Sequence, residues 1–395
     1  MIEFDEALER VRSAARPLGT ETVVVHEAAR RVLAAPVVAR IASPRSDVSA
    51  MDGYAVRDSD LHELPARLRV AGESFAGAGW DGTVAAGECV RIFTGAPIPA
   101  GANRVVIQEN VRREGDLAVI EELPGTARHV RNRGGDFEEG DVVLPAGRLL
   151  DGRAIVAAAA ADIAELEAFS RPRLFILSTG DELAQPGMAA REPDAVPESV
   201  SLGIAAMASE WGAAVTGRQR LRDELGAMEQ SAVRALAEAD LVVVTGGASV
   251  GEKDFARAMF GPWGLDLLFS KVSMKPGKPV WLGRSGDSLV MGLPGNPTSA
   301  LVTARLLLTP LLAGMSGRDA GEALRWRTAR LAVPLGESRD RETFHRARWA
   351  GDKVEILAFQ DSSAQKALAE ADLLVRQSAN SPAIPAGGEV SVLDF

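Results

Sequence analysis

The chain contains 395 residues, 46% of them hydrophobic and 25% charged, values that are typical of a globular protein with roughly two to four domains. Its 44 basic and 54 acidic residues give a formal net charge of −10, which argues against a uniformly basic nucleic-acid-binding protein. The single cysteine, Cys89, excludes a disulfide framework and a multi-thiolate metal centre.

The first residues are acidic, where a signal peptide would be basic and then apolar, and no apolar run reaches the length of a membrane-spanning helix. We therefore expect a cytoplasmic protein with neither a nucleic-acid nor a membrane partner. A small anionic ligand is compatible with the acidic composition if basic residues gather locally, as they do in residues 271–279.

Residues 1–40 have a largely helical pattern. Apolar residues recur at helical spacing near the start, namely Phe4, Leu8 and Val11. Residues 26–35 follow a similar pattern, and a strand-like segment at residues 22–25 separates the two. These features predict a mainly helical N-terminal domain.

Residues 41–140 differ, because short apolar runs such as residues 105–107 alternate with glycine and proline. This pattern predicts a small β domain. Helical propensity returns in residues 151–169, although the second half of that segment is ambiguous. The β domain is therefore expected to be an insertion, with residues 1–40 and 141–170 forming one discontinuous N-terminal domain.

Residues 171–320 alternate apolar strands with helices, which is typical of a doubly wound α/β domain. The expected strands are short apolar runs of the kind buried in parallel sheets: residues 174–177, 241–244 and 289–291. The expected helices cover residues 201–211, 226–239 and 298–312. Residues 321–395 return to a β pattern, so the chain is predicted to be a multidomain α/β protein with a C-terminal β domain.

Each predicted α/β strand runs into a loop rich in glycine and polar residues. Ligands of open α/β sheets bind outside the carboxyl ends of the strands, and glycine-rich turns let backbone N–H groups approach an anion. Asn296 is expected to cap the following helix, with Pro297 at its first position. Three such loops favour a binding site over ordinary turns. The candidate binding residues are Thr179, Gly180, Gly246, Gly247, Ser249 and Asn296.

Charged side chains accompany these loops. Glu182 and Asp254 lie just beyond strand ends and, together with a phosphate-bearing substrate, are candidates for holding Mg²⁺. Lys275 and Lys278 are candidates for cradling an oxyanion as point charges. Taken one at a time, each of these residues is better explained as a solvated loop residue.

Six motifs, taken together, resemble the molybdopterin molybdenumtransferases, the family that includes the gephyrin E domain. They occur in the family's order and cover nearly the whole chain, in residues 49–56, 91–97, 177–183, 245–251, 274–279 and 293–300. The resemblance implies the last step of molybdenum cofactor synthesis, in which molybdate is inserted into adenylylated molybdopterin with Mg²⁺ and AMP is released. It also implies that the pterin, rather than a protein cysteine, supplies the sulfur ligands of the metal.

The family implies an elongated homodimer of four-domain subunits, in which the Asp of the Met-Asp-Gly-Tyr loop is contributed to the site of the other subunit. By position that residue is Asp52, and Thr94 and Asp136 are expected to join it from the β domain. The acidic residues that match those of the family in the α/β domain are Glu182, Asp223 and Asp254.

By the same resemblance, molybdate is expected to contact a set of residues near the lysines: Lys275, Lys278, the backbone at Pro279, Ser299, Arg346 and Ser362. One departure lies here, because a common family form of the C-terminal loop, Gln-Gly-Ser-His, is replaced by Gln360-Asp361-Ser362-Ser363, which places an acid near the oxyanion. Tungstate has the same charge and nearly the same size as molybdate, so both oxyanions remain candidates.

Two other functions are alternatives. The gephyrin E domain also acts as a dimeric scaffold that anchors receptor peptides, but we see no long linker or second module in the sequence. A molybdopterin adenylyltransferase shares the Thr-Gly-Gly loop, but it does not need the N-terminal β zone. The expected partners are a pterin nucleotide, a second copy of the chain, the adenylyltransferase and the acceptor molybdoenzymes.

Overall fold

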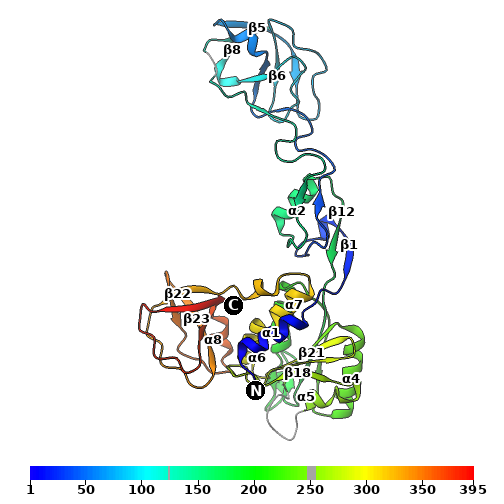
Figure 1. Ribbon diagram of the computed structural model, residues 1–395, viewed down its shortest axis with the longest axis vertical. Helices are drawn as coiled ribbons and strands as arrows, with labels where there is room; N and C mark the ends of the chain where they lie inside the picture. Colours follow the sequence, from blue (N-terminus) through cyan, green and yellow to red (C-terminus); the bar gives the residue numbers. More distant parts are fainter. Residues whose placement is uncertain (123–124, 247–254) are drawn as a thin grey trace.

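The computed structural model describes residues 1–122, 125–246 and 255–395. The molecule is elongated, and Figure 1 shows a β domain at one end, a narrow middle segment, and a wide body that holds the α/β domain and the C-terminal β domain. The middle segment contains β1 (Thr20–Val24), β2 (Val37–Val38), β11 (Val142–Leu144), α2 (Gly152–Ala160) and β12 (Glu165–Phe169).

Helix α1 (Phe4–Ala14) forms where the sequence predicts it, with acidic residues in its first turn and Arg12 in its last, as the helix dipole favours. Its apolar face is buried in the core of the α/β domain, and Phe4 also packs edge-on against Phe344 at 4.8 Å between ring centres. Helix α1 therefore does not join the other elements of the predicted discontinuous N-terminal domain.

The middle segment is held by two antiparallel strand pairs: β1 (Thr20–Val24) with β12 (Glu165–Phe169), and β2 (Val37–Val38) with β11 (Val142–Leu144). Helix α2 (Gly152–Ala160) packs beside them and begins at Asp151, whose Oδ1 accepts a hydrogen bond of 2.9 Å from the Ala154 N–H.

Two helical predictions in this segment are wrong. Residues 26–35 contain only the end of the short 3₁₀ helix η1 (Val25–Glu27), because Arg30 adopts a positive φ of 63° and Leu33 pairs with Ala168 in a β-bridge. The second half of residues 151–169 is strand β12, in which Leu166 and Ala168 alternate with exposed residues. Pairing with β1 prevails there over helix propensity.

The inserted β domain is a six-stranded sheet of order β7-β4-β6-β5-β9-β8, in which only the β5–β6 pair is parallel among the described strands. A further short pair, β3 with β10, lies beside it. The bounds are β3 (Val48–Ser49), β4 (Gly53–Val56), η2 (Asp58–Leu61), β5 (Ala66–Ser74), β6 (Glu88–Ile92), β7 (Arg104–Ile107), η3 (Gln108–Asn110), β8 (Val111–Glu114), β9 (Leu117–Ile120) and β10 (Val130–Arg131). The predicted β domain is confirmed.

The α/β domain contains a six-stranded sheet of order β16-β13-β17-β21-β20-β18. The strands from β16 to β21 in this order are parallel, whereas β20 pairs antiparallel with both β21 and the edge strand β18, so the sheet is mixed. The bounds are β13 (Arg173–Thr179), β16 (Ala214–Leu221), β17 (Leu241–Thr245), β18 (Asp266–Ser270), β20 (Trp281–Ser285) and β21 (Ser288–Leu293).

Helices cover both faces of this sheet, as the doubly wound prediction requires. Side chains alternate along β13, so that Ile176 packs with α3 (Val200–Glu210) and α6 (Pro297–Thr303), whereas Leu177 packs with α4 (Leu225–Glu238) and α5 (Phe255–Ala258). The short 3₁₀ helix η5 (Gly261–Trp263) follows α5.

Helix α6 continues through a π-helical stretch, η6 (Ala304–Leu308), into α7 (Thr309–Met315). The combined helix, Pro297–Met315, is long and apolar enough to cross a membrane by length and composition. It is, however, 94% buried within the fold, as expected for the core helix of this domain.

The C-terminal β domain consists of five strands whose pairings close into a ring: β23–β24, β24–β22, β22–β26, β26–β25 and β25–β23. Their bounds are β22 (Arg327–Leu331), β23 (Glu342–Ala350), β24 (Lys353–Ile356), β25 (Leu373–Gln377) and β26 (Glu389–Asp394). In chain order, η7 (Ala320–Leu324) precedes β22, and α8 (Gln365–Ala369) lies between β24 and β25. Strand β19 (Met274–Lys275) comes from the α/β domain and pairs with β23.

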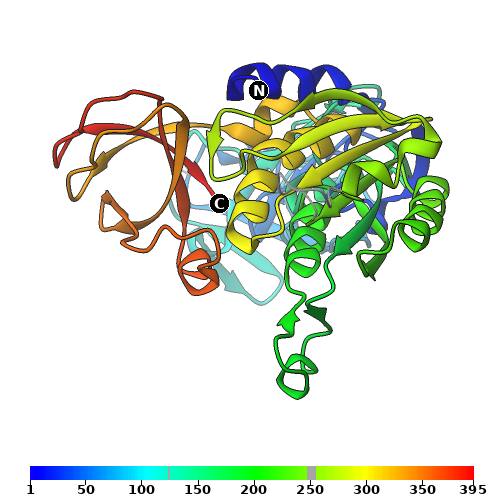
Figure 2. The ribbon, with the colours of Figure 1, turned by 90° about the horizontal axis from the view of Figure 1, so that it is seen from below.

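A short parallel pair, β14 (Leu183–Ala184) with β15 (Val196–Pro197), extends from the carboxyl end of β13, with η4 (Ala189–Arg191) at its tip. Figure 2 shows this arm projecting from the body.

Candidate functional site

A crevice of about 650 Å³ lies at the carboxyl ends of β13, β17 and β21, which is the position predicted for the binding site. The loops that follow these strands form its walls. The site residues predicted from the sequence that line it are Thr179, Gly180, Glu182, Asp223, Gly246, Pro279 and Asn296. Gly247, Ser249 and Asp254 lie outside the described residues.

The loops after β13, β17 and β21 pack backbone against backbone at the base of the crevice. Gly246 has a φ of +90°, and a Cβ atom there would lie 2.4 Å from the carbonyl oxygen of Thr179. At Gly295, an added Cβ would lie 3.2 Å from the Cα of Gly246. Because Gly246 leaves no room for a side chain and Gly295 leaves little, the crevice has a base of bare backbone that a ligand can approach closely.

Two carboxylates from different loops, Glu182 and Asp223, line the crevice. The Gly180 N–H donates to the carbonyl of Leu221 at 3.2 Å, and the Asp223 N–H donates to Asp181 Oδ1 at 3.1 Å, so the loop after β13 is tied to the end of β16. Within the described parts of the chain, no group of three or more His, Cys, Asp or Glu residues could hold a metal ion.

This donor set fits a hard cation that takes few protein carboxylates. Mg²⁺ commonly binds one or two carboxylates together with substrate phosphates and water. Zinc instead takes three or four nitrogen, sulfur or carboxylate ligands from the protein. Glu182 has the chemistry of a Mg²⁺ ligand, whereas its predicted partner Asp254 lies outside the described residues.

Glu198 is a crevice residue that sequence reasoning missed. It is only 9% exposed, and its carboxylate accepts hydrogen bonds from the Ser201 N–H at 2.8 Å, from Ser201 Oγ at 2.6 Å and from Ser178 Oγ at 3.3 Å. It thereby satisfies the first turn of α3 and joins that helix to the end of β13. The available signal was an acid just before a helix, a position at which anions are stabilised.

The predicted oxyanion residues are only partly at the crevice. Pro279 lines it, whereas Lys275, Lys278 and Ser299 do not, and both lysines are exposed while Ser299 is buried in the first turn of α6. Lys275 pairs with Thr343 across β19 and β23, so this loop joins the α/β domain to the C-terminal ring. Burial lowers the pKa of His345 on β23, and the charge of Lys275 lowers it further.

Asn296 precedes α6 at the predicted N-cap position, but its side chain makes no capping hydrogen bond. Its Nδ2 instead donates to Ser362 Oγ at 2.9 Å, and the Thr298 N–H donates to the carbonyl of Ser362 at 3.1 Å. The capping prediction is thus wrong for the side chain. These bonds join the C-terminal loop that contains Ser362 to the start of α6, and the neighbouring Ser363 lines the crevice.

Arg346 lies beneath this C-terminal loop and is only 2% exposed. Its guanidinium donates to the carbonyl of Asp361 at 3.0 Å and, more weakly, to the carbonyl of Ala364 at 3.4 Å, and burial lowers its pKa. Hydrogen bonds from Ser363 lower the pKa of the Asp361 carboxyl. The Asp361 carboxylate, which departs from the common family form, is therefore bound by donors of its own loop.

Asp52 and Thr94 form a compact pair in the β domain. Asp52 Oδ1 accepts hydrogen bonds from the Thr94 N–H at 2.7 Å and from Thr94 Oγ1 at 2.8 Å, and these bonds lower the pKa of Asp52, with a smaller contribution from Arg91. Asp136 lies between β10 and β11, where its N–H donates to the carbonyl of Ser43 at 3.0 Å.

These three residues do not reach the crevice of their own chain. In Figure 1 the middle segment separates the β domain from the α/β domain, so Asp52 and Thr94 lie at the opposite end of the molecule. The structure therefore divides the predicted site residues between two places that one chain does not bring together.

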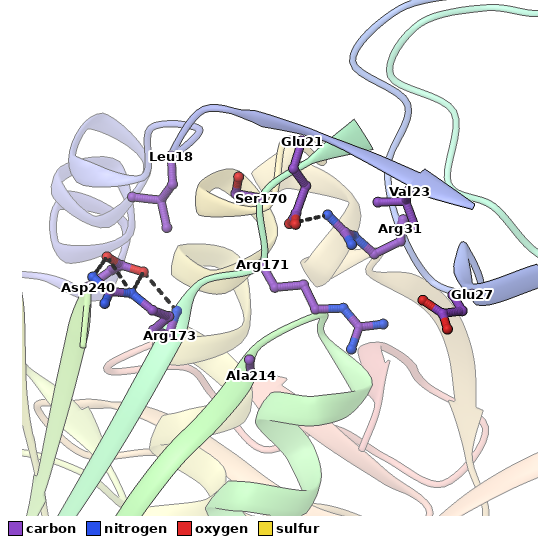
Figure 3. Close-up of a pocket in the computed structure, with 10 residues that line it drawn as sticks. All are labelled: Leu18, Glu21, Val23, Glu27, Arg31, Ser170, Arg171, Arg173, Ala214 and Asp240. Atoms are coloured by element: carbon purple, nitrogen blue, oxygen red, sulfur yellow. Dashed lines mark hydrogen bonds and ion pairs between the residues drawn. The ribbon is translucent and has the colours of Figure 1, made fainter. Parts of the chain in front are cut away.

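Another pocket, of about 680 Å³, lies near the opposite ends of the sheet strands (Figure 3). Its residues include Arg173 at the start of β13 and Asp240 just before β17. Arg173 pairs with Asp240 at 2.7 Å, and Arg31 pairs with Glu21 at 2.6 Å. Because two of its arginines are paired with acidic side chains and it lies away from the carboxyl ends of the strands, this pocket is a weaker candidate for the site.

Three family models match consecutive parts of the chain. Residues 2–161 match the MoeA N-terminal region (domain I and II), residues 175–314 match a probable molybdopterin binding domain, and residues 328–395 match the MoeA C-terminal region (domain IV).

Individual relatives agree with these models. The molybdopterin molybdenumtransferase of Haemophilus influenzae is 36% identical over 320 residues, which cover 80% of this chain and 78% of the relative. Molybdopterin molybdenumtransferase 2 of Mycobacterium tuberculosis is 34% identical over 354 residues, covering 87% and 86%. The crystal structure of the MoeA protein of Pyrococcus horikoshii superposes over 100% of both chains with a TM-score of 0.85 at 25% identity.

Proposed function

This chain belongs to the molybdopterin molybdenumtransferase (MoeA) family, and from that premise we propose that it inserts molybdate into adenylylated molybdopterin, with Mg²⁺-dependent release of AMP. It is an enzyme of molybdenum cofactor biosynthesis. The observation that carries the more specific proposal is the crevice whose base is bare backbone at Gly246 and Gly295 and whose walls carry Glu182 and Asp223.

The crevice suits a pyrophosphate-bearing ligand. Backbone N–H groups of glycine-rich loops and the N-terminus of α6 favour negative charge. Glu182, together with Asp254, is the proposed holder of Mg²⁺, which would neutralise phosphate charge when bound. Asp223 is proposed to contact the ligand directly.

The oxyanion is proposed to bind beside the crevice, where Lys275 and Lys278 are exposed and Pro279 reaches the wall. Lysine ammonium groups hold a tetrahedral dianion as point charges. We propose that Ser299, Ser362 and Arg346 shape this place, with Arg346 acting through the C-terminal loop that it supports.

Asp52, Thr94 and Asp136 are proposed to complete the crevice of a partner subunit in a homodimer. The support is their position at the far side of the middle segment from the crevice of their own chain. We also propose the division into residues 1–40 with 141–170, 41–140, 171–320 and 321–395, amended so that α1 is counted with the α/β core in which it is buried.

The test is AMP release from adenylylated molybdopterin in Mg²⁺, with and without molybdate. Release that depends on molybdate is expected. Replacing Lys275 and Lys278 by alanine should raise the molybdate concentration required by on the order of ten- to a hundredfold, as expected for lost contacts to a charged group. Lys353→Ala, at an exposed position of β24, is the matched control and should leave the molybdate requirement unchanged. Release without molybdate dependence would contradict the proposal.

Sharing between subunits is tested by mixing two inactive variants, Asp52→Ala and Glu182→Ala. Random mixing gives heterodimers with one intact site each, so activity should return to about a quarter of the wild-type value. Absence of recovery after verified exchange of subunits would contradict the shared site. It would not change the conclusion drawn from the AMP-release test about the reaction.

A further inference from the structure

A pocket of about 530 Å³ lies between the middle segment and the segment that follows α7. One wall is the loop of residues 145–149, between β11 and α2. Among the described residues, the charged side chains that line it are three arginines and one carboxylate: Arg148, Arg318, Arg325 and Glu322. We call this the arginine pocket. It shares no lining residue with the crevice.

The positive charge here is only partly neutralised. Glu322 is bound by Arg325, and Asp151 is bound both by Arg148 at 3.2 Å and by Arg153 at 2.6 Å. Since the whole chain is acidic, with a net charge of −10, this local excess does not follow from composition.

Arg318 is attracted by Glu322 but forms no ion pair with it or with any other described residue. Over the described residues its Nε is buried with no hydrogen-bond partner. Its guanidinium lies over an aromatic ring, with the guanidinium carbon 4.3 Å from the centre of the Trp211 ring. Burial lowers the pKa of Arg318, and the charges of Arg325 and Arg30 lower it further against the attraction of Glu322.

The pocket of Figure 3 provides a comparison within the same molecule. It also contains three arginines, but Glu21, Glu27 and Asp240 accompany them, and the pairs Arg31–Glu21 and Arg173–Asp240 are closed. Arg31 Nε in that pocket is, over the described residues, also buried without a hydrogen-bond partner. The arginine pocket differs from it in having an excess of arginines over carboxylates.

We propose that the arginine pocket binds a phosphate-type oxyanion, either free or as the phosphate group of a nucleotide. Guanidinium groups match tetrahedral oxyanions through paired N–H donors, and three of them line this pocket: Arg148, Arg318 and Arg325. Because Arg148 belongs to the middle segment and Arg318 follows α7, the bound anion joins the middle segment to the wide body. This site is independent of the reaction proposed for the crevice.

The experiment is calorimetric titration of the full chain with inorganic phosphate at low ionic strength, where charge interactions are least screened. Saturable binding is expected, weakened at least tenfold by Arg148→Gln and by Arg318→Gln. Arg153→Gln is the matched control, because it removes a cation that shares Asp151 with Arg148 but does not line the pocket; it should change the affinity less than twofold.

A second control replaces Lys275 and Lys278 by alanine and should leave the arginine-dependent binding intact. Loss of binding in this variant with retention in Arg148→Gln would overturn the proposal, as would the absence of saturable binding. Arg148→Gln keeps the test decisive if Arg318→Gln disturbs the Trp211 contact. Titration with AMP distinguishes the sources: Arg148-dependent binding tighter than that of phosphate assigns the site to a nucleotide phosphate, and equal or weaker binding assigns it to a free oxyanion.

Discussion

Thr94 controls the ionisation of Asp52 through two donors, its N–H and its hydroxyl, which both bind Asp52 Oδ1. Because donors favour the charged carboxylate, Asp52 keeps its negative charge to a lower pH than an ordinary aspartate. Substitution of Thr94 by valine keeps the backbone N–H donor and removes the hydroxyl donor.

Thr94→Val is expected to raise the pKa of Asp52 toward its ordinary value, since the hydroxyl bond is lost. An NMR titration of the Asp52 carboxyl would measure this shift, and the acid limb of the AMP-release profile should move to higher pH with it. Thr94→Ser retains a hydroxyl and should keep the wild-type titration. An unchanged Asp52 pKa in Thr94→Val would mean that the backbone bond alone sets it.

At this scale the sequence predicted some residues by type and position but not their partners. Glu182 lines the crevice because strand ends of an open sheet converge, as the sequence pattern predicted. Asp223 also lines it, but that residue was expected only from the family resemblance. Glu198 was missed although its bonds to Ser201 are local; its longer bond to Ser178 spans 20 positions and depends on the fold. The bond from Asn296 to Ser362 spans 66 positions and is invisible in local patterns.

Among the elements, the loop after β17 depends most on one backbone position. Gly246→Ala would place a Cβ 2.4 Å from the Thr179 carbonyl oxygen at a φ of +90°. We expect a loss of about 1–3 kcal/mol in the unfolding free energy of the α/β domain, together with weaker ligand binding.

The matched control is Gly226→Ala in α4, where an added Cβ meets nothing within 4 Å and no positive φ is required. That change should instead stabilise the domain by about 0.5–1 kcal/mol, because alanine restricts the unfolded chain and favours helix. Chemical unfolding followed by circular dichroism measures both. Equal effects of the two substitutions would show that the loop tolerates a side chain at Gly246.

The elements that sequence patterns predicted correctly are those with a strong local pattern. Helix α1 has apolar residues at helical spacing, and strands β13, β17 and β21 are continuous apolar runs that the sheet buries, so local pattern and tertiary packing agree. Strand β12 is short, and its partner β1 lies more than a hundred residues earlier. Its conformation is set by that pairing, which no local window contains.

At the scale of the whole molecule, the β domain and the α/β domain have separate apolar cores. Ile120 is buried in the first and Ile176 in the second, and the two clusters share no residue. We therefore expect two thermal transitions. Ile120→Val should lower the midpoint of only one transition and Ile176→Val that of only the other. Each substitution should reduce the unfolding free energy of its own domain by about 0.5–1.5 kcal/mol. Differential scanning calorimetry measures both, and a common shift in the two variants would contradict independent unfolding.

The middle segment holds the β domain at a distance from the wide body, and it contains the strand pairs β1–β12 and β2–β11. For any bending of such a segment, displacement grows in proportion to distance from the bend, so the β domain moves farther than β1 does. In the proposed homodimer, the accuracy with which Asp52 reaches the crevice of the partner would therefore be set by the contact of the β domain with the partner subunit.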